Sequence, residues 1–198
     1  MKARIAVFVS GGGTNLQALI DAQGKSLNSG EIYLVMSNNT HAYALERAQK
    51  AGIPTEVVLK KGNQEAFEDK LMEVLRKYEI DLIVLAGFMT ILTEKFTSCY
   101  PKRIINVHPS LIPSFCGEGF YGLHVHQAAL DYGVKVTGAT VHFVNEIPDG
   151  GEIIAQKAVE ILPGDTSEIL QRRVMEQAEW LLLPQAAETV CASIIGGN

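Results

Sequence analysis

Residues 104–114 read IINVHPSLIPS, and they combine a short apolar strand pattern with reactive side chains. The apolar start predicts a buried strand, which Pro109 should end because proline has no N–H for a sheet ladder. Side chains alternate along a strand, so Asn106 and His108 should point the same way. Parallel sheets bind ligands beyond the carboxyl ends of their strands. We therefore expect an amide and an imidazole to face one ligand-binding crevice.

A third reactive group follows in residues 141–151, which read VHFVNEIPDGG: an alternating strand and then a turn that contains Asp149. A carboxylate beside an imidazole favours its cationic form, and an amide N–H can bind an oxyanion. His108 is therefore a candidate general acid, Asp149 its partner carboxylate and Asn106 an oxyanion donor. They lie far apart in the sequence, so only the fold can bring Asp149 to His108.

Strand and helix patterns alternate over the first part of the chain. Strands are predicted at residues 2–9, 31–37, 55–59 and 81–87, and helices at 16–20, 42–51 and 64–78. This alternation predicts an α/β fold with a mainly parallel, doubly wound sheet. The later pattern predicts an added antiparallel strand pair at 136–144 and 152–160, then a C-terminal helix over 166–195 that is interrupted at Pro184. We expect a single domain over residues 1–198, with a phosphate-binding half to about residue 100 and a catalytic half beyond it.

A glycine-rich turn, SGGGTN at residues 10–15, separates the first strand from the first helix. Glycines let backbone N–H groups approach an anion, and a helix N-terminus favours negative charge. The turn matches neither the dinucleotide nor the Walker pattern, so a single phosphate is the preferred ligand. A tight turn with a helix cap is the alternative.

The composition bounds the partners that we expect. The chain has 198 residues, of which 47% are hydrophobic and 20% charged, and a net charge of −5. These values are typical of a globular protein and give no basic surface for a nucleic acid. No apolar run reaches the roughly 18 residues of a membrane span, and the first strand pattern leaves no room for a signal peptide. We expect a cytoplasmic protein with small-molecule partners.

Two other site chemistries fit the sequence less well. His124 and His126 lack a metal-binding motif or a cysteine cluster, so no metal site is expected, and both histidines, like His142, should be structural. Cys116 has no neighbouring base that would make it a nucleophile. The apolar loop at residues 88–92 either packs in the ordinary way or lines a site for an aromatic ligand.

These motifs, taken together, resemble those of the folate-dependent formyltransferases. The resemblance rests on residues 106–113, 122–126, 138–143 and 149–151, with support from 10–17 and 86–89. It implies the formyltransferase fold and direct transfer of a formyl group from 10-formyltetrahydrofolate to the amine of glycinamide ribonucleotide through a tetrahedral intermediate, in de novo purine biosynthesis. It implies no metal, and it makes the second half of the chain the folate-binding half.

The resemblance also assigns roles to residues. It implies that Asn106 and His108 stabilise the oxyanion, that His108 donates a proton and that Asp149 raises the pKa of His108. The implied substrate-binding residues are Gly12, Gly13, Thr14 and Asn15 at the phosphate, with Glu176, Gln177, Ala178 and Glu179, of which Glu179 holds the ribose hydroxyls. The implied folate-binding residues are Gln64, Met89, Thr90, Ile91, Leu92, Asn106, Asn145, Glu146, Ile147, Pro148 and Asp149.

The chain departs from the family pattern at three places. The spacing from Val174 to Pro184 is one residue longer than the resemblance predicts. Gln64 and Thr90 stand where relatives often carry arginine, which removes a cationic hold on the glutamate tail of the folate. Residues 114–121, SFCGEGFY, include an insertion of about five residues, which is either a lid beside the site or a tolerated surface loop.

Three rival readings stay open at this point. Formyltetrahydrofolate hydrolase and methionyl-tRNA formyltransferase share the three reactive groups, but they usually carry a further domain for which 198 residues leave no room. A non-catalytic sensor of a phosphorylated metabolite would explain the glycine-rich turn but not the joint presence of Asn106, His108 and Asp149. The sequence does not distinguish a monomer from a homodimer.

Overall fold

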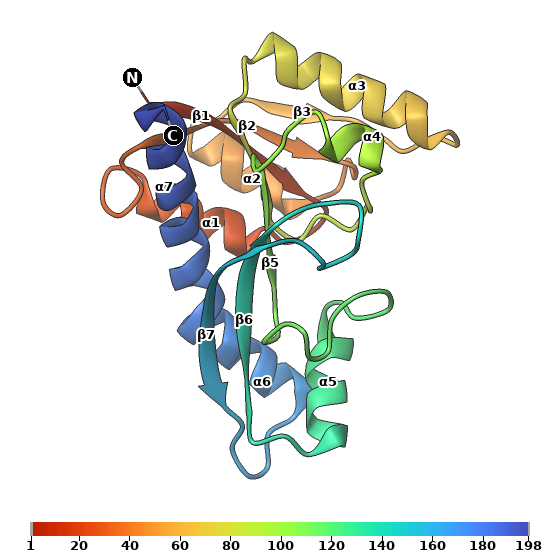
Figure 1. Ribbon diagram of the computed structural model, residues 1–198, viewed down its shortest axis with the longest axis vertical. Helices are drawn as coiled ribbons and strands as arrows, with labels where there is room; N and C mark the ends of the chain where they lie inside the picture. Colours follow the sequence, from red (N-terminus) through yellow and green to blue (C-terminus); the bar gives the residue numbers. More distant parts are fainter. Residues whose placement is uncertain (1, 198) are drawn as a thin grey trace.

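The computed structural model describes residues 2–197, which fold around one seven-stranded sheet of order β3-β2-β1-β4-β5-β6-β7 (Figure 1). The strands are β1 (Ala3–Val9), β2 (Gly30–Ser37), β3 (Thr55–Val57), β4 (Leu82–Leu85), β5 (Ile104–His108), β6 (Val136–Phe143) and β7 (Ile153–Glu160). The strands from β3 to β5 in this order are parallel, and β6 and β7 continue the sheet as antiparallel neighbours. The predicted α/β sheet with an added antiparallel pair is confirmed.

Helices cover both faces of the sheet. They are α1 (Thr14–Ala22), α2 (Tyr43–Lys50), α3 (Gln64–Lys77), α4 (Glu94–Thr97), α5 (Leu123–Tyr132), α6 (Ser167–Val174) and α7 (Trp180–Gly196), with a π-helical turn, η1 (Met175–Glu179), between the last two. One hydrophobic cluster joins α1, α2 and α7 to one face, and a second joins α3 and α4 to the other. Within residues 2–197, none of the helices has the length and apolar character needed to cross a bilayer.

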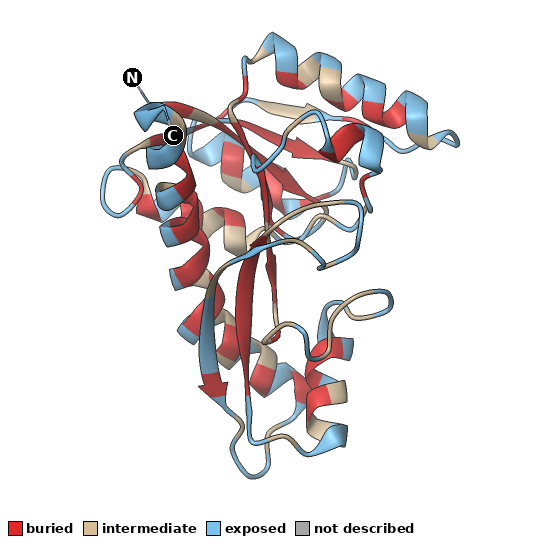
Figure 2. Cartoon of the chain, in the orientation of Figure 1, coloured by how far each residue is buried: buried red, intermediate tan, exposed pale blue. Residues whose placement is uncertain are grey.

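Strand β4 is apolar throughout, and β1 is apolar except at Arg4, because both faces of these central strands are covered, as in other parallel sheets (Figure 2). In β1, Ile5 and Val7 belong to the cluster with α7, while Ala6 and Phe8 belong to the cluster with α3. From β1, the next strands along the chain are added toward one edge of the sheet, and from β4 they are added toward the other edge. The strand order therefore reverses between β1 and β4, which pair with each other. Such a reversal leaves a crevice at the carboxyl ends of the strands.

The interruption predicted at Pro184 is wrong. Helix α7 continues through Pro184, and the irregular turn is η1, which comes directly before Trp180. A π-helical turn accommodates one residue more than a regular α-helical turn, so the helical stretch from α6 to α7 continues past η1. Pro184 lies one turn into α7, close to η1, where the change in hydrogen bonding already breaks the regular ladder.

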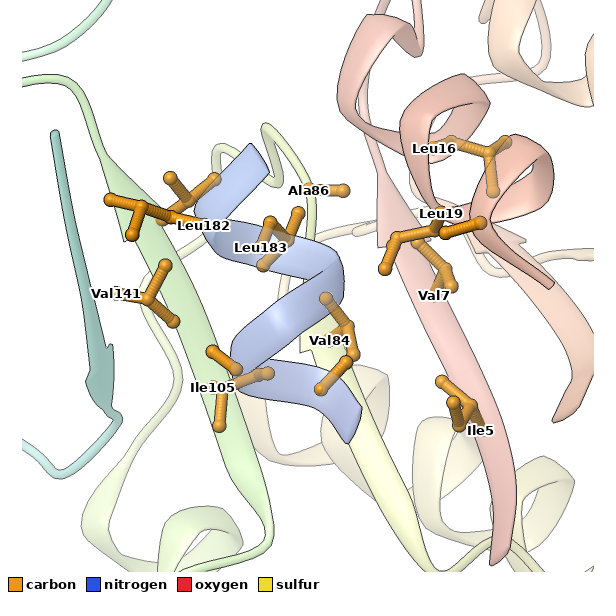
Figure 3. Packing of buried hydrophobic residues seen from close by; sticks show 14 of the residues in the cluster. Ile5, Val7, Leu16, Leu19, Val84, Ala86, Ile105, Val141, Leu182 and Leu183 are labelled. Atoms are coloured by element: carbon orange, nitrogen blue, oxygen red, sulfur yellow. The ribbon is translucent and has the colours of Figure 1, made fainter. Parts of the chain in front are cut away.

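Helix α7 forms the largest part of the core on its face of the sheet. Leu182 and Leu183 pack among Val84, Ile105 and Val141, which come from three different strands (Figure 3). Leu183 is fully buried. Burial of one such side chain is worth about 1.5–3 kcal/mol, so α7 contributes substantially to the stability of the sheet.

We expect Leu183→Ala to lower the free energy of unfolding by about 2–5 kcal/mol, because truncation leaves a cavity between the helix and the sheet. Leu181→Ala on the same helix is the matched control, since Leu181 is 45% exposed, and it should change the value by less than about 1 kcal/mol. Urea denaturation of the two variants measures the difference. Similar losses in both would contradict the packing of α7 described above.

Candidate active site

A cavity of about 710 Å³ lies at the carboxyl ends of β4 and β5. Its walls come from the loop after β4, the end of β5, the turn after β6, the segment before α5 and the π-helical turn η1. The segment before α5 and the turn between β6 and β7 lie on the same side of the sheet (Figure 1). The cavity therefore collects segments that are distant in sequence, including all three predicted reactive groups.

The structure brings His108 and Asp149 together, as the sequence predicted. Asn106 and His108 line the cavity from β5, which ends at His108. The Nδ1 atom of His108 lies 3.3 Å from Oδ2 of Asp149. The turn that carries Asp149 is tight: Gly151 lies so close to Phe143 that a Cβ atom would be 1.7 Å from the Phe143 carbonyl oxygen, so only glycine fits.

Residues 114–121, the segment expected to contain an insertion, supply further partners to His108 and Asp149. The Nε2 atom of His108 lies 2.9 Å from the carbonyl oxygen of Phe115, to which it donates when protonated. The backbone N–H of Gly117 donates to Oδ2 of Asp149 at 2.9 Å. Residues 117–122 line the cavity as well. The segment at 114–121 is thus part of the wall of the site, and its contacts with His108 and Asp149 come from main-chain atoms.

Burial dominates the protonation of His108. His108 is 4% exposed, and its burial lowers its pKa below the ordinary imidazole value, although Asp149 and the Phe115 carbonyl act in the opposite direction. Asp149 by itself raises the pKa of His108, as expected, but the pKa of His108 is lowered overall because the effect of burial is larger. For Asp149, burial acts to raise the pKa, but the neighbouring His142 ring, the hydrogen bond from the backbone N–H of Gly117 and the neighbouring His108 outweigh it and hold the pKa below the usual range.

Two histidines that the sequence analysis treated as structural also border the cavity. The Nε2 atom of His142 lies 3.2 Å from Nδ2 of Asn106 and 3.5 Å from Oδ1 of Asp149. His126 is buried beside them, and neither of its ring nitrogens has a hydrogen-bond partner within residues 2–197. Burial, with a smaller effect from His108, lowers the pKa of His126 to about 4, so this ring is neutral at physiological pH. Neither placement has a signal in the sequence, because both depend on how β6 and α5 pack against β5.

The glycine-rich turn lies at the start of α1, next to the cavity. Gly13 has a φ angle of 73°, and a Cβ atom there would be 2.6 Å from Cβ of Ala44, so glycine is required for the close approach of α2. The Nε atom of Arg47 donates to the carbonyl oxygen of Gly12 at 2.8 Å. This bond turns the carbonyl toward the guanidinium group and places a positive charge beside the turn. Gly12 itself has open space around its Cα.

Thr14 and Asn15 connect this turn to the cavity. Thr14 Oγ1 lies 3.8 Å from the sulfur of Met175, which borders the cavity, and Asn15 lines the cavity directly. The Nδ2 atom of Asn15 donates to Oε2 of Glu179 at 2.7 Å. Burial raises the pKa of Glu179 to about 6, while the bond from Asn15 acts to lower it. A buried carboxyl group that borders a cleft and has a raised pKa is typical of a functional site.

Of the four predicted substrate residues in this part of the chain, the structure brings only Glu179 to the cavity. Ala178 is fully buried in the hydrophobic core. Glu176 pairs with Arg172 at 2.8 Å on the exposed side of the helix, and Gln177 is also exposed. The wide turn η1 is the physical reason, because it changes which positions face the cavity relative to a regular α-helix.

Most of the predicted folate residues line the cavity, and two do not. Exposed apolar side chains gather at its mouth: Met89, Ile91 and Ile147 are 57%, 62% and 57% exposed. Thr90, Leu92, Asn106, Asn145, Pro148 and Asp149 line it too. The side chain of Gln64 instead donates to Glu68 and to the carbonyl oxygen of Ile91, and supports the loop after β4 from outside the cavity. Glu146 borders a separate groove.

The described residues provide two further facts about the chemistry of the site. No group of three or more His, Cys, Asp or Glu side chains between residues 2 and 197 is arranged to hold a metal ion. Burial raises the pKa of Cys116, and its thiol donates to the carbonyl oxygen of Pro113 at 3.3 Å. A raised pKa keeps a thiol protonated and makes it a poor nucleophile.

Residues 3–186 match the family model described as formyl transferase, so the chain belongs to this family. Among its relatives, the phosphoribosylglycinamide formyltransferase of Haemophilus influenzae is 44% identical over 183 residues, which cover 91% of this chain and 84% of the relative. The trifunctional purine biosynthetic protein adenosine-3 of Bos taurus is 44% identical over 98% of this chain. The chain spans only 19% of the length of that protein.

Solved structures agree with this family assignment. The crystal structure of glycinamide ribonucleotide transformylase 1 from Symbiobacterium toebii has a TM-score of 0.90 and 40% sequence identity, over 97% of this chain and 89% of that one. The crystal structure of phosphoribosylglycinamide formyltransferase from Brucella melitensis has a TM-score of 0.88 and 42% identity, over 97% of each chain. The fold of this chain is therefore the one that these enzymes share.

The raised pKa of Glu179 predicts a pH-dependent stability. Its pKa in the folded state is about 6, above the value of 4.5 that it has when solvated, so the folded state binds its proton more tightly. This contribution to stability is present below pH 4.5 and is lost as the pH rises through 6. Glu179→Gln abolishes the titration. We expect the unfolding free energy of this variant, minus that of the wild type, to rise by on the order of 2 kcal/mol between pH 4 and pH 8.

Denaturation curves at several pH values measure this difference. A difference that stays constant with pH would contradict a raised pKa at Glu179.

Proposed function

We propose that this protein transfers the formyl group of 10-formyltetrahydrofolate to the amine of glycinamide ribonucleotide, giving formylglycinamide ribonucleotide and tetrahydrofolate in de novo purine biosynthesis. The observation that carries the proposal is that one cavity joins Asn106, His108 and Asp149 to an apolar mouth on one side and to Asn15 and Glu179 on the other. The names of the relatives support the same reaction.

The geometry supports direct transfer. The substrate amine forms a bond to the formyl carbon, and the formyl oxygen becomes an oxyanion that the amide of Asn106 and the ring of His108 stabilise as hydrogen-bond donors. The oxyanion then re-forms the C=O bond as the bond from this carbon to the folate nitrogen breaks. His108 gives its proton to the leaving nitrogen, and the proton that the attacking amine loses passes to the His108 ring, which is thereby protonated again. The lowered pKa of His108 makes its protonated form a stronger acid.

The two nitrogens of His108 have different tasks in this proposal. Nδ1 faces the carboxylate of Asp149, so Nε2 is the nitrogen that meets the reacting groups. In the structure, Nε2 lies against the Phe115 carbonyl, and the hydrogen bond to this carbonyl has to be exchanged for one to the substrate. Asp149 supports the cation that His108 becomes before it gives up its proton.

The remaining cavity residues divide between the two substrates. The phosphate lies at the turn of Gly12, Gly13 and Thr14, where the N-terminus of α1 and the guanidinium of Arg47 favour negative charge. Glu179 holds the ribose hydroxyls. The pteridine lies against the exposed apolar residues at the mouth, and the glutamate tail has no arginine at positions 64 and 90. The protein acts in the cytoplasm as a single formyltransferase domain, as a monomer or homodimer, without a metal, a nucleic acid or a membrane partner.

Formation of tetrahydrofolate from 10-formyltetrahydrofolate should require glycinamide ribonucleotide, which a spectrophotometric assay with and without the ribonucleotide shows. His108→Ala and Asp149→Asn should each lower kcat by roughly 10²–10⁴-fold, because both groups act mainly in the transition state. Calorimetry should find their binding of the ribonucleotide unchanged. His124→Ala, at an exposed histidine, is the control that keeps full activity.

Two outcomes would redirect the proposal. Release of formate without the ribonucleotide would identify a hydrolase. Binding of the ribonucleotide with no turnover of either kind would favour a non-catalytic sensor.

The phosphate position has its own test. Gly12→Val should weaken binding of glycinamide ribonucleotide roughly tenfold, or about 1.4 kcal/mol, because the new side chain enters the space that the phosphate needs. The fold should tolerate the change, since no protein atom lies within 4 Å of the Cβ position. Calorimetric titration measures both ligands, and the dissociation constant of the folate serves as the internal control. An unchanged affinity for the ribonucleotide would exclude this turn as the phosphate site.

A further inference from the structure

His142 is placed against Asn106 by the register of the sheet. Strand β6 runs antiparallel to β5, and the two residues are direct partners across this pair. Side chains opposite each other in an antiparallel pair lie on the same face and close together. His142 is only 2% exposed, so its ring nitrogens must find their partners within the protein.

The contacts of the His142 ring select one tautomer. Nδ1 lies 2.7 Å from the carbonyl oxygen of Phe143, which can only accept a hydrogen bond, so Nδ1 carries the proton. A neutral ring with its proton on Nδ1 has an unprotonated Nε2, which can only accept. Nε2 lies 3.2 Å from Nδ2 of Asn106, and an amide nitrogen can only donate. The Nδ1–H tautomer satisfies both contacts, whereas an imidazolium would place two donors face to face.

Asp149 is the competing partner of the same nitrogen. Its Oδ1 lies 3.5 Å from Nε2 of His142, which is longer than the contact with Asn106 and beyond the usual length of a good hydrogen bond. The other carboxylate oxygen of Asp149 already faces His108 and accepts from Gly117. Asn106 is therefore the better partner for His142.

Acceptance by His142 fixes the orientation of the amide of Asn106. The oxygen and the nitrogen of an asparagine side chain are nearly equal in shape, and only the hydrogen bonds decide which of them faces which way. An oxyanion is stabilised by the nitrogen, which has two N–H groups, and is repelled by the oxygen. With one N–H donated to His142, the second is left for the substrate.

We propose that His142 is a positioning residue for the formyl transfer: by accepting a hydrogen bond from Asn106, it holds the amide nitrogen, and not the amide oxygen, toward the oxyanion. This inference rests on the proposed function, and it adds a requirement that the three reactive groups do not include. It also assigns Asn106 and His142 to one unit, separate from the pair of His108 and Asp149.

Double-mutant cycles separate these units. His142→Phe keeps a ring of similar size and removes the acceptor; we expect kcat to fall roughly 10–100-fold, as for other residues that orient a functional side chain, with both KM values changed less than about threefold. In the background of Asn106→Ala, His142→Phe should cause no further loss. In the background of Asp149→Asn, its full effect should remain. His142→Gln, whose carbonyl oxygen can accept from Asn106, should recover part of kcat.

Two kinetic results would overturn the proposal. One is a loss of kcat from His142→Phe that persists in full in the Asn106→Ala background. The other is a loss that disappears in the Asp149→Asn background, since this would mean that His142 acts through the carboxylate. The tautomer is read independently of activity by nitrogen-15 NMR of the wild type, which should show a protonated Nδ1 and an unprotonated Nε2 on His142 at pH 7. A protonated Nε2 would also overturn it, even if a variant fails to fold. Absence of any formyl transfer by the wild type would instead count against the proposed function.

Discussion

The antiparallel pairing of β5 with β6 sets the positions of Asn106, His108 and His142 in the cavity. Ile105, Val107 and Val141 from these strands lie in the core on one face, while Asn106, His108 and His142 lie on the opposite face. Because side chains alternate, a slip of one residue would exchange the two sets and bury the polar groups in the core. The hydrophobic core and the site therefore enforce the same register, and the stability of the sheet guarantees the geometry of the site.

Burial gives the site its electrostatic character, and it does so at some expense of stability. His108, His126 and Glu179 all have pKa values displaced toward their neutral forms, because a charge is poorly solvated in this cavity. Asp149 is the exception, since three neighbours donate to it or carry positive charge when protonated. The cavity thus keeps one negative charge among groups that are easily neutralised. The lowered pKa of His108 favours proton transfer, because its protonated form gives up the proton readily.

Local patterns in the sequence are sufficient to predict the fold, the end of β5 and the glycine-rich turn, because each of these features depends on residues that are close together in the sequence. The interruption predicted at Pro184 failed because a local rule for proline does not register a π-helical turn upstream, and the same turn decides that Glu179 faces the cavity while Ala178 does not. The place of His142 depends on strand register. The contacts of Phe115 and Gly117 are made by main-chain atoms, which every residue has, so no side-chain motif could announce them.

The main-chain contacts of residues 114–121 affect how this site can change in evolution. Because the segment meets His108 and Asp149 through a carbonyl group and an N–H group, substitutions at Cys116 or Glu118 leave both contacts chemically intact, whereas a deletion removes them together. The two contacts depend on the length and backbone path of the segment, including the positive φ angles of Gly117 and Gly119, which favour glycine. Two related proteins could have different residues in this segment and still make the same hydrogen bonds. An alignment scored on residue identity would then classify a segment that contacts His108 and Asp149 as a variable loop.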